Sequence, residues 1–368
     1  MANTYLSQAK QEKYDEFYTR WADIEKEIQA YLEFDPTLFY GKTVLCPCDD
    51  PFESHFFKYF ALRFNDLGLK KLIATCYIGS PIASTQLTLF DNEPIDNKTT
   101  KTPHKIEITE VADYNRDAAI DLSDVAWLLA NTKNVLTRLA GDGDFRSDEL
   151  CALRDQADII VTNPPFSLFR EFVPWVMAAQ KQFLIIGNIN AITYKEIFPL
   201  IKNNHMWLGA TNFNRGMYFK VPDSFVYAAS YKFDKEQQGE KVSRVAGVCW
   251  FTNINHGRRH RPLSLLTMAE NLRYSKELRG KPGYEKYDNY AAIEVPTFAV
   301  IPADYDGVMG VPVTFLDKYC PEQFEILGAT ESEGKGFSAG LWDEQYKVAQ
   351  PLVNGAKVYK RIFIKKRG

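Results

Sequence analysis

Residues 157–171, ADIIVTNPPFSLFRE, place a short apolar run directly before two prolines. The run IIV at 159–161 is β-branched and does not alternate with polar residues, which indicates a strand buried on both faces of a parallel sheet. Neither Pro164 nor Pro165 has an amide hydrogen to donate to a neighbouring strand, so we expect the strand to end at Asn163. NPPF therefore lies just past the carboxyl end of a buried strand, where ligands bind in open α/β sheets.

The rest of the apolar pattern alternates between helical and strand periods, which predicts a doubly wound α/β domain. Helices are expected near the N-terminus and over 53–64, 168–180 and 193–203. Strands are expected within 41–51, 70–78, 134–145 and 182–190, and antiparallel strands closing the sheet over 207–210, 216–221 and 245–254. Residues 80–135 are polar and irregular, and we interpret them as an insertion that contains one helix near Ala126.

The periodicity weakens from about residue 257, where Gly, Pro, Tyr and basic residues dominate. We therefore predict a catalytic domain over 1–256 and a smaller second domain over 257–368.

Two other loops follow predicted strands, as NPPF does. CPCDD at 46–50 follows the first strand, at the position where doubly wound folds hold their cofactors. GDGDF at 141–145 has glycines that permit close backbone approach, an acid that can accept from an amino group, and a phenylalanine that can cover a ring. Each of these loops, and DEFYT at 15–19, is also compatible with a plain polar segment.

NPPF has the chemistry to hold a planar amine. An exocyclic amino group on a base is a poor nucleophile, because its lone pair is delocalised into the ring. Two acceptors outside the ring plane would localise that lone pair. Asn163 offers a side-chain carbonyl and Pro164 a backbone carbonyl, and Pro165 fixes the backbone between them. Phe166 offers a face for stacking. The alternative is a turn that merely contains two prolines.

Charge is distributed unevenly along the chain. Residues 1–150 carry 16 Lys and Arg against 25 Asp and Glu, whereas residues 151–368 carry 28 against 22. The second part is therefore the one expected to meet a polyanion, with HGRRHR at 256–261 and the tail at 357–368 as its basic clusters. The alternative is a solvated loop and a frayed terminus.

Several classes of protein are disfavoured by the sequence. The start lacks the apolar core of a signal peptide, and no apolar run is long enough to span a bilayer. The six cysteines show neither paired CxxC spacing nor the density of a disulfide scaffold. We expect a cytoplasmic protein.

In combination, DEFYT, CPCDDP, GDGDF and NPPF resemble the S-adenosylmethionine-dependent adenine-N6 DNA methyltransferases, and the resemblance is closest to the EcoRI-type modification methylases. NPPF matches their catalytic motif, (D/N/S)PP(Y/F/W). Further shared strings are FFKYFA, LGLKKLIA, VTNPPFSLFRE, ITYKE, KYDNY and GVMGVPVTFL, so the resemblance covers most of the chain.

The resemblance implies a role for each matching position. The target N6 would be held by Asn163 and Pro164, on a backbone fixed by Pro165, with the flipped adenine stacked on Phe166. The methionine part of the cofactor would be lined by Cys46, Pro47, Cys48, Asp49 and Asp50. The adenine of the cofactor would meet Asp144 and Phe145, and the pocket would be closed by Phe17, Tyr18 and Thr19.

Two departures from the family pattern leave the ribose and methionine contacts open. The first loop lacks the glycine-rich FxGxG form, and the second strand ends in TCY without the acid that usually binds the cofactor ribose. Asp49, Asp50 and Tyr77 are the alternatives.

The resemblance further implies a flipped adenine in double-stranded DNA, S-adenosylhomocysteine as product, and neither metal nor covalent intermediate. It implies a short palindromic site such as GAATTC, a restriction-modification or orphan methylase, and a functional monomer. The second domain would grip phosphates with Arg258, Arg259, His260 and Arg261. The alternatives are methylation of RNA adenine or protein glutamine, and a DNA-binding relative without catalysis.

Overall fold

The computed structural model describes 18–49, 54–76, 103–117, 119–131, 136–211, 213, 216–221, 225–237, 239–330 and 337–367. The chain forms two compact units, of which the first comprises 1–188 and 215–254 and the second comprises 189–214 and 255–368. The change of unit after residue 254 lies close to the boundary expected at 256. Residues 189–214, which the sequence pattern assigns to the first domain, belong to the second unit instead.

The first unit is built on a mixed sheet. The strands that this unit contributes to it, in the order β5-β4-β3-β2-β6-β7-β12, are Leu136–Arg138, His104–Ile108, Lys71–Thr75, Thr43–Cys46, Ile159–Thr162, Gln182–Asn188 and Val248–Thr252. Strand β2 runs parallel to β3 and β6, and β6 runs parallel to β7. Strands β4 and β12 are antiparallel to their neighbours. The expected α/β sheet is thus present, with a parallel centre and antiparallel strands toward its edges.

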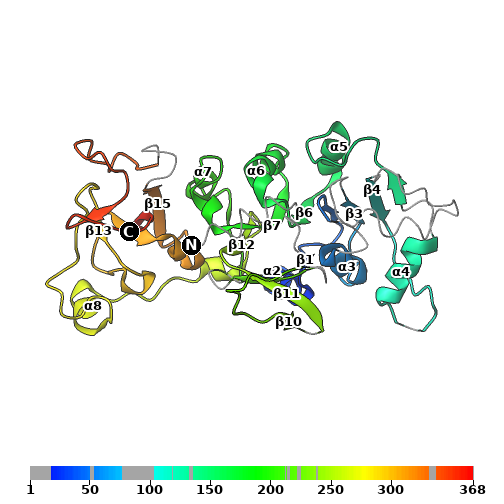
Figure 1. The fold of residues 1–368 in the computed structure, drawn as a ribbon, viewed down its shortest axis with the longest axis horizontal. Helices are drawn as coiled ribbons and strands as arrows, with labels where there is room; N and C mark the ends of the chain where they lie inside the picture. The colour runs from blue at the N-terminus through cyan, green and yellow to red at the C-terminus, as the bar shows by residue number, and fades with distance from the viewer. Residues whose placement is uncertain are drawn as a thin grey trace. The chain divides into compact units, whose positions relative to one another are not determined.

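The helices of the first unit lie on both faces of this sheet. They are α2 (Trp21–Leu32), α3 (His55–Leu62), α4 (Leu122–Asn131), α5 (Asp148–Gln156) and α6 (Phe169–Ala178). Figure 1 shows α5 and α6 on one side of the central strands and α3 and α4 on the other. Every residue of β2 and β6 is buried, which explains their unalternated apolar sequences.

Two predictions about this unit are wrong. The helix expected near Ala126 is confirmed as α4, but the described part of 80–135 is not an irregular insertion, because it also supplies β4 to the central sheet. The β4 sequence HKIEI alternates buried and half-buried residues, and its polar members conceal the strand. Residues 216–221 do not close the main sheet either. Strand β9 (Met217–Lys220) alternates in burial and pairs with β11 (Glu240–Val245).

Strand β9 belongs to a second, smaller sheet. Its order is β1-β9-β11-β10, in which β1 is Tyr18–Thr19 and β10 is Glu236–Gln237. The pairing of Thr19 with Phe219 brings the last two residues of DEFYT beside a strand that lies some 200 residues later.

The second unit has a sheet of its own in the order β13-β14-β18-β15: Ile293–Glu294, Met309–Pro312, Arg361–Lys366 and Phe324–Ala329. Its other elements are α7 (Phe198–Lys202), β8 (Trp207–Leu208), α8 (Met268–Tyr274), β16 (Leu352–Val353) and β17 (Ala356–Lys357). The basic tail is not a frayed terminus over its described length. Strand β18 pairs with β14 on one side and β15 on the other.

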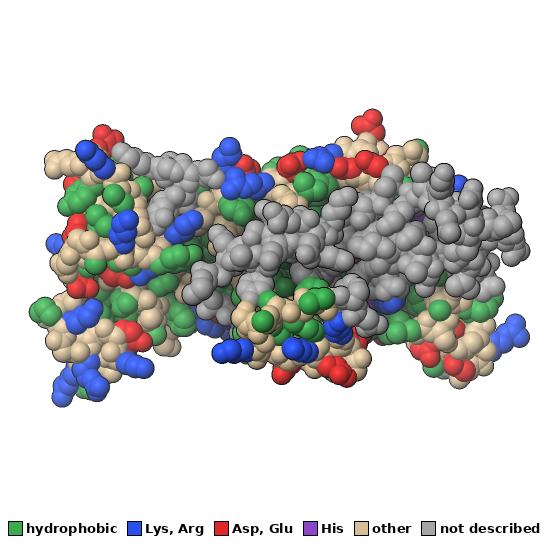
Figure 2. Space-filling view, viewed as in Figure 1, with side chains coloured by type: hydrophobic (Ala, Val, Ile, Leu, Met, Phe, Trp, Pro, Cys, Tyr) green, Lys and Arg blue, Asp and Glu red, His purple; other side chains and the backbone are tan. Residues whose placement is uncertain are grey.

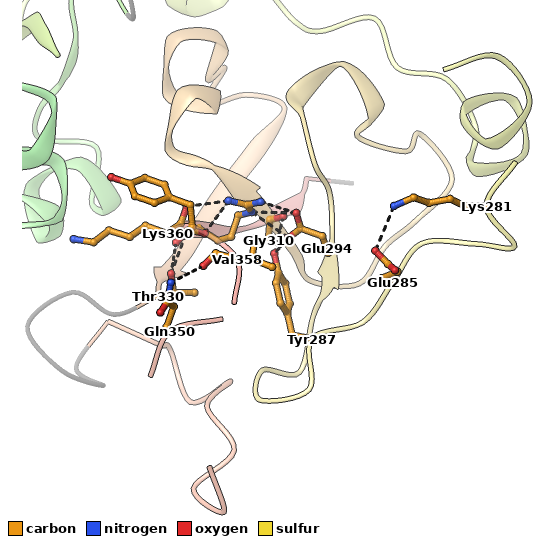
Figure 3. Close-up of polar contacts among 11 residues, drawn as sticks. Lys281, Glu285, Tyr287, Glu294, Gly310, Thr330, Gln350, Val358 and Lys360 are labelled. Atoms are coloured by element: carbon orange, nitrogen blue, oxygen red, sulfur yellow. Dashed lines mark hydrogen bonds and ion pairs between the residues drawn. The ribbon is translucent and has the colours of Figure 1, made fainter. Parts of the chain in front are cut away.

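A buried polar network holds β18 to β13. The Arg361 guanidinium donates to both carboxylate oxygens of Glu294, at 2.7 Å from Nη2 and 3.0 Å from Nε. The Tyr287 hydroxyl donates to the same carboxylate and lies 3.2 Å from the Gly310 carbonyl (Figure 3). Burial, with the adjacent Glu294 charge, raises the pKa of the Tyr287 phenol well above its usual value.

Candidate active site

The carboxyl ends of four strands meet at one edge of the central sheet. Strands β3 and β5 are both antiparallel to β4, so they point the same way, and β2 and β6 run parallel to β3 and to each other. The loops CPCDD, GDGDF and NPPF therefore all begin at this edge. The central sheet thus brings together three segments that lie far apart in the sequence.

NPPF forms a tight turn from β6 into a helix. Strand β6 ends at Thr162, Asn163 and Pro165 are half-buried, and Pro164 is buried. The Pro165 carbonyl accepts the Leu168 amide at 2.9 Å, which closes a 3₁₀ turn over Phe166–Leu168 before α6 begins. Because that carbonyl is engaged, Pro164 supplies the candidate backbone acceptor.

The Asn163 acceptor lies in a different environment from Phe166, the candidate stacking ring. The side-chain carbonyl oxygen of Asn163 is shielded from solvent. Phe166 is half-buried and packs against the apolar core of the first unit. Such a ring is fixed by the core on one side while part of its surface remains accessible, as a stacking platform requires.

The first loop is anchored to both neighbouring strands. Asp49 is 6% exposed, and its carboxylate accepts hydrogen bonds from the hydroxyls of Ser54 at 2.7 Å and Thr162 at 2.5 Å. The Thr75 hydroxyl donates to the Pro47 carbonyl at 2.8 Å. Burial, with the nearby Asp49 charge, raises the pKa of the Cys46 thiol, so this thiol is protonated at neutral pH.

The remaining members of CPCDD are less informative. Cys48 is half-buried in the turn after β2. Asp50 lies outside the described residues, as does Tyr77, the alternative ribose contact.

The GDGDF loop places its two functional candidates differently. The Asp144 carboxylate pairs with Arg146 at 2.5 Å and keeps 29% of its side chain exposed. Hydrogen bonding from Arg146 holds the pKa of Asp144 below its usual value, so the group is an ionised acceptor. Phe145 is only 4% exposed and packs edge-on against Phe172, at a centroid distance of 5.2 Å. Its ring belongs to the core in this structure, rather than covering a cofactor ring.

The end of DEFYT lies beside the helix that follows the first loop. The Thr19 carbonyl is 2.8 Å from Nδ1 of His55, the first residue of α3. The Thr19 hydroxyl is buried and has no hydrogen-bond partner among the residues that the structure describes. Of the other two candidates, Tyr18 is described only in its backbone, and Phe17 lies outside the described residues.

Most of the 256–261 cluster is engaged within the second unit. Arg259 is 6% exposed, its guanidinium lies 3.7 Å from the Trp207 ring centroid, and it donates to Asn204. Arg258 forms an ion pair with Asp317 at 2.6 Å.

The other two residues of the cluster differ in exposure. The His260 ring lies 2.9 Å from both Glu322 and Asn255. Only Arg261, of the four candidates, is exposed. Arg258, Arg259 and His260 therefore all have polar partners within the second unit.

Comparison with known proteins shows the family to which this chain belongs. The adenine-specific methyltransferase EcoRI family matches residues 5–367. Type II methyltransferase M.EcoRI of Escherichia coli is 39% identical over 99% of this chain and 97% of its own length. The chain belongs to the EcoRI family of adenine-specific methyltransferases.

Two further relatives of the same kind are similar along the chain. Type II methyltransferase M.MpnI of Mycoplasma pneumoniae is 35% identical over 88% of this chain and 85% of its own length. M.MgeORF184P of Mycoplasma genitalium is 34% identical over 99% of both chains. No solved structure matches the chain.

Membership of this family confirms the predicted adenine-specific methyltransferase. Within the described part of the chain, no helix is long and apolar enough to cross a membrane, and no group of His, Cys, Asp and Glu could hold a metal ion.

Sequence reasoning missed Thr162 and Ser54, the hydroxyls bound by Asp49. Neither residue is marked by a motif, because a serine between an acid and an aromatic run, or a threonine at the end of a strand, is common in proteins. Their partner becomes visible only when the strands are assembled.

Proposed function

We propose that this protein transfers a methyl group from S-adenosylmethionine to N6 of an adenine flipped out of duplex DNA. The observation that carries the proposal is the position of NPPF. It follows the central strand β6, and the residue before Asn163 is hydrogen-bonded to the first loop. This position supports an amine-binding role for a turn that lies beside the loop where a doubly wound fold holds a cofactor.

The described residues fit the cofactor in part. Thr19 offers a buried hydroxyl to a ligand, and Asp144 offers an ionised, partly exposed acceptor for the amino group of the cofactor adenine. The turn at Cys46–Cys48 would line the methionine part. Phe145 supports α6 in our proposal, because its ring is buried there. When bound, S-adenosylmethionine supplies an electrophilic methyl group.

The chain's own residues would activate the target amine. Asn163 and the Pro164 carbonyl accept the two N6 hydrogens out of the ring plane, which localises the nitrogen lone pair. The two prolines keep these acceptors aligned before the base arrives, so little reorganisation is needed during the reaction. Phe166 stacks on the base and compensates part of the cost of unstacking it, which is about a few kcal/mol.

The exposed cations suited to DNA phosphates lie on and after α8. Arg273, Lys276, Arg279 and Lys281 are all exposed, and Tyr274 among them keeps 63% of its surface. Figure 2 shows Lys and Arg side chains gathered over this part of the second unit. We therefore propose α8 and the segment to Lys281 as the phosphate-binding surface, with Arg261 as an additional contact.

We further propose a short palindromic site such as GAATTC and a functional monomer. A palindrome presents the same adenine on both strands, and half-methylated DNA after replication needs only one strand modified at a time. One active subunit per site is then sufficient. Sedimentation of the protein with a site-containing duplex should show one subunit bound, and two subunits would refute the monomer.

The experiment that tests the function is product analysis. Purified protein, S-adenosylmethionine and a GAATTC duplex should yield N6-methyladenine by mass spectrometry, while an RNA duplex of the same sequence should stay unmodified. Methylation of the RNA in preference to the DNA would contradict the proposal.

A further inference from the structure

The Asp49 carboxylate joins the first loop to the strand that carries NPPF. Its Oδ2 accepts a hydrogen bond from the hydroxyl of Thr162, which is 0% exposed and is the last residue of β6. Its Oδ1 accepts from Ser54, whose oxygen in turn caps α3 by accepting the Phe56 amide at 3.1 Å. One side chain thus ties together three elements.

The backbone of Asp49 is fixed as well. Its amide donates to the Thr75 carbonyl at 3.1 Å, and the Thr75 side chain holds the Pro47 carbonyl. The carboxylate therefore projects from a loop that is anchored to β3. Its hydrogen bond to Thr162 holds the end of β6 in a fixed position.

This arrangement disfavours Asp49 as the ribose contact, a role that the sequence leaves open for it. A carboxylate has two oxygens, and each of these accepts a hydroxyl inside the protein. The side chain is also only 6% exposed, so little of its surface is accessible to a ligand.

We propose that Asp49 is a positioning residue for methyl transfer, which sets the position of Asn163 through Thr162. The inference rests on the proposed role of NPPF. Asn163 directly follows Thr162, so a shift of the Thr162 side chain moves the acceptor that must meet N6. A displacement of about 1 Å at a reacting group can slow a reaction about 100-fold.

The test compares Thr162→Val, which keeps the shape of the side chain and removes its hydroxyl, with Thr162→Ser, which keeps the hydroxyl. Single-turnover methylation should fall about 10- to 100-fold in Thr162→Val and stay within about threefold of wild type in Thr162→Ser. The Kd for S-adenosylmethionine, measured by calorimetry, should change less than about threefold in both. Wild-type turnover by Thr162→Val would overturn the inference, as would equal losses in the two variants.

Asp49→Asn supplies the same test through the partner, and it applies even if Thr162→Val does not fold. The rate should fall with the cofactor Kd maintained. Combining Asp49→Asn with Thr162→Val should slow the reaction no further than the slower single variant, because both changes act on the same hydrogen bond. A rise in the cofactor Kd with an unchanged rate would make Asp49 a cofactor ligand and overturn the inference.

Thr75→Val is the matched control. It removes a buried strand-end hydroxyl of the same kind, but one that holds the first loop through Pro47. It should raise the cofactor Kd more than it slows the bound complex. If Thr75→Val and Thr162→Val behave alike, Thr162 has no specific link to catalysis. Wild-type protein that fails to methylate adenine would defeat the proposed function itself, whereas fast variants of an active wild type defeat only this inference.

Discussion

At the scale of single residues, the sequence predicts some features of the site, and only the structure shows others. The amine-binding chemistry that we propose for NPPF follows from four consecutive residues, because the prolines fix the backbone. The contact between Asp49 and Thr162 could not be predicted from the sequence, because the two residues lie 113 positions apart and neither belongs to a recognisable motif with the other. The burial of Phe145 was equally inaccessible, because it depends on the aromatic face of α6.

Asp144→Ala should weaken S-adenosylmethionine binding by about 1–3 kcal/mol, since it removes one partner of a polar contact to the ligand. Calorimetric titration measures this loss. Asp148→Ala, which removes an exposed carboxylate at the start of α5, is the control and should bind normally. Equal losses in Asp144→Ala and Asn163→Ala would contradict our separation of cofactor and base pockets.

Phe166→Ala should reduce base flipping, because stacking of a base on an aromatic ring contributes about 1–3 kcal/mol. A 2-aminopurine at the target position reports flipping by its fluorescence, which should change in Phe166→Ala complexes and be retained in Phe166→Trp. Unchanged emission in the alanine variant would rule out stacking on this ring.

Strands with uniform burial were predictable, and strands with mixed burial were not. The predominantly apolar sequences of β2, β6 and β12, all of whose residues are buried, predict a central sheet. The alternating HKIEI of β4 and MYFK of β9 fit either a main sheet or a subsidiary one, and only their partners decide. The tail illustrates the same limit, since RIFIKK reads as a basic cluster and yet lies between two strands as β18.

Arg361→Ala should destabilise the second unit, because it leaves the Glu294 carboxylate buried without its cation. Burial alone would lower the pKa of Arg361, but hydrogen bonds to Glu294 raise it overall, so the Arg361 guanidinium is charged in the folded chain. We expect a loss of about 3–5 kcal/mol in the free energy of unfolding, measured by denaturant titration. Replacing both residues, as in Arg361→Met with Glu294→Leu, should recover much of that loss. A stability of Arg361→Ala equal to wild type would show that the pair is dispensable.

At the scale of the whole molecule, the uneven charge predicts that the second part of the chain meets a polyanion, but it does not indicate through which surface. The 256–261 cluster is conspicuous in the sequence because its basic residues are consecutive. In the structure, however, Arg259 stacks on Trp207 and Arg258 pairs with Asp317. The exposed cations around α8 are spread through the sequence and are noticed only once burial is known.

Replacing Arg273, Lys276 and Arg279 together by Ala should weaken binding to all duplexes and reduce the salt dependence of the affinity, since phosphate contacts release counterions. The control variant replaces Lys195, Lys202 and Lys347, which are exposed in the same unit and carry the same total charge. Fluorescence anisotropy at several salt concentrations compares the two. A changed sequence preference with an unchanged salt slope would mean that the α8 cations read bases rather than phosphates.

The central claim is that Asn163 acts on N6 of an adenine in DNA. The most direct measurement is mass spectrometry of DNA incubated with wild-type and Asn163→Ala protein, alongside calorimetry of S-adenosylmethionine binding. We predict N6-methyladenine with the wild type, a methylation rate at least about 100-fold lower with the variant, and a nearly unchanged cofactor Kd. N4-methylcytosine as the product, or a variant rate within a few-fold of wild type, would contradict the account.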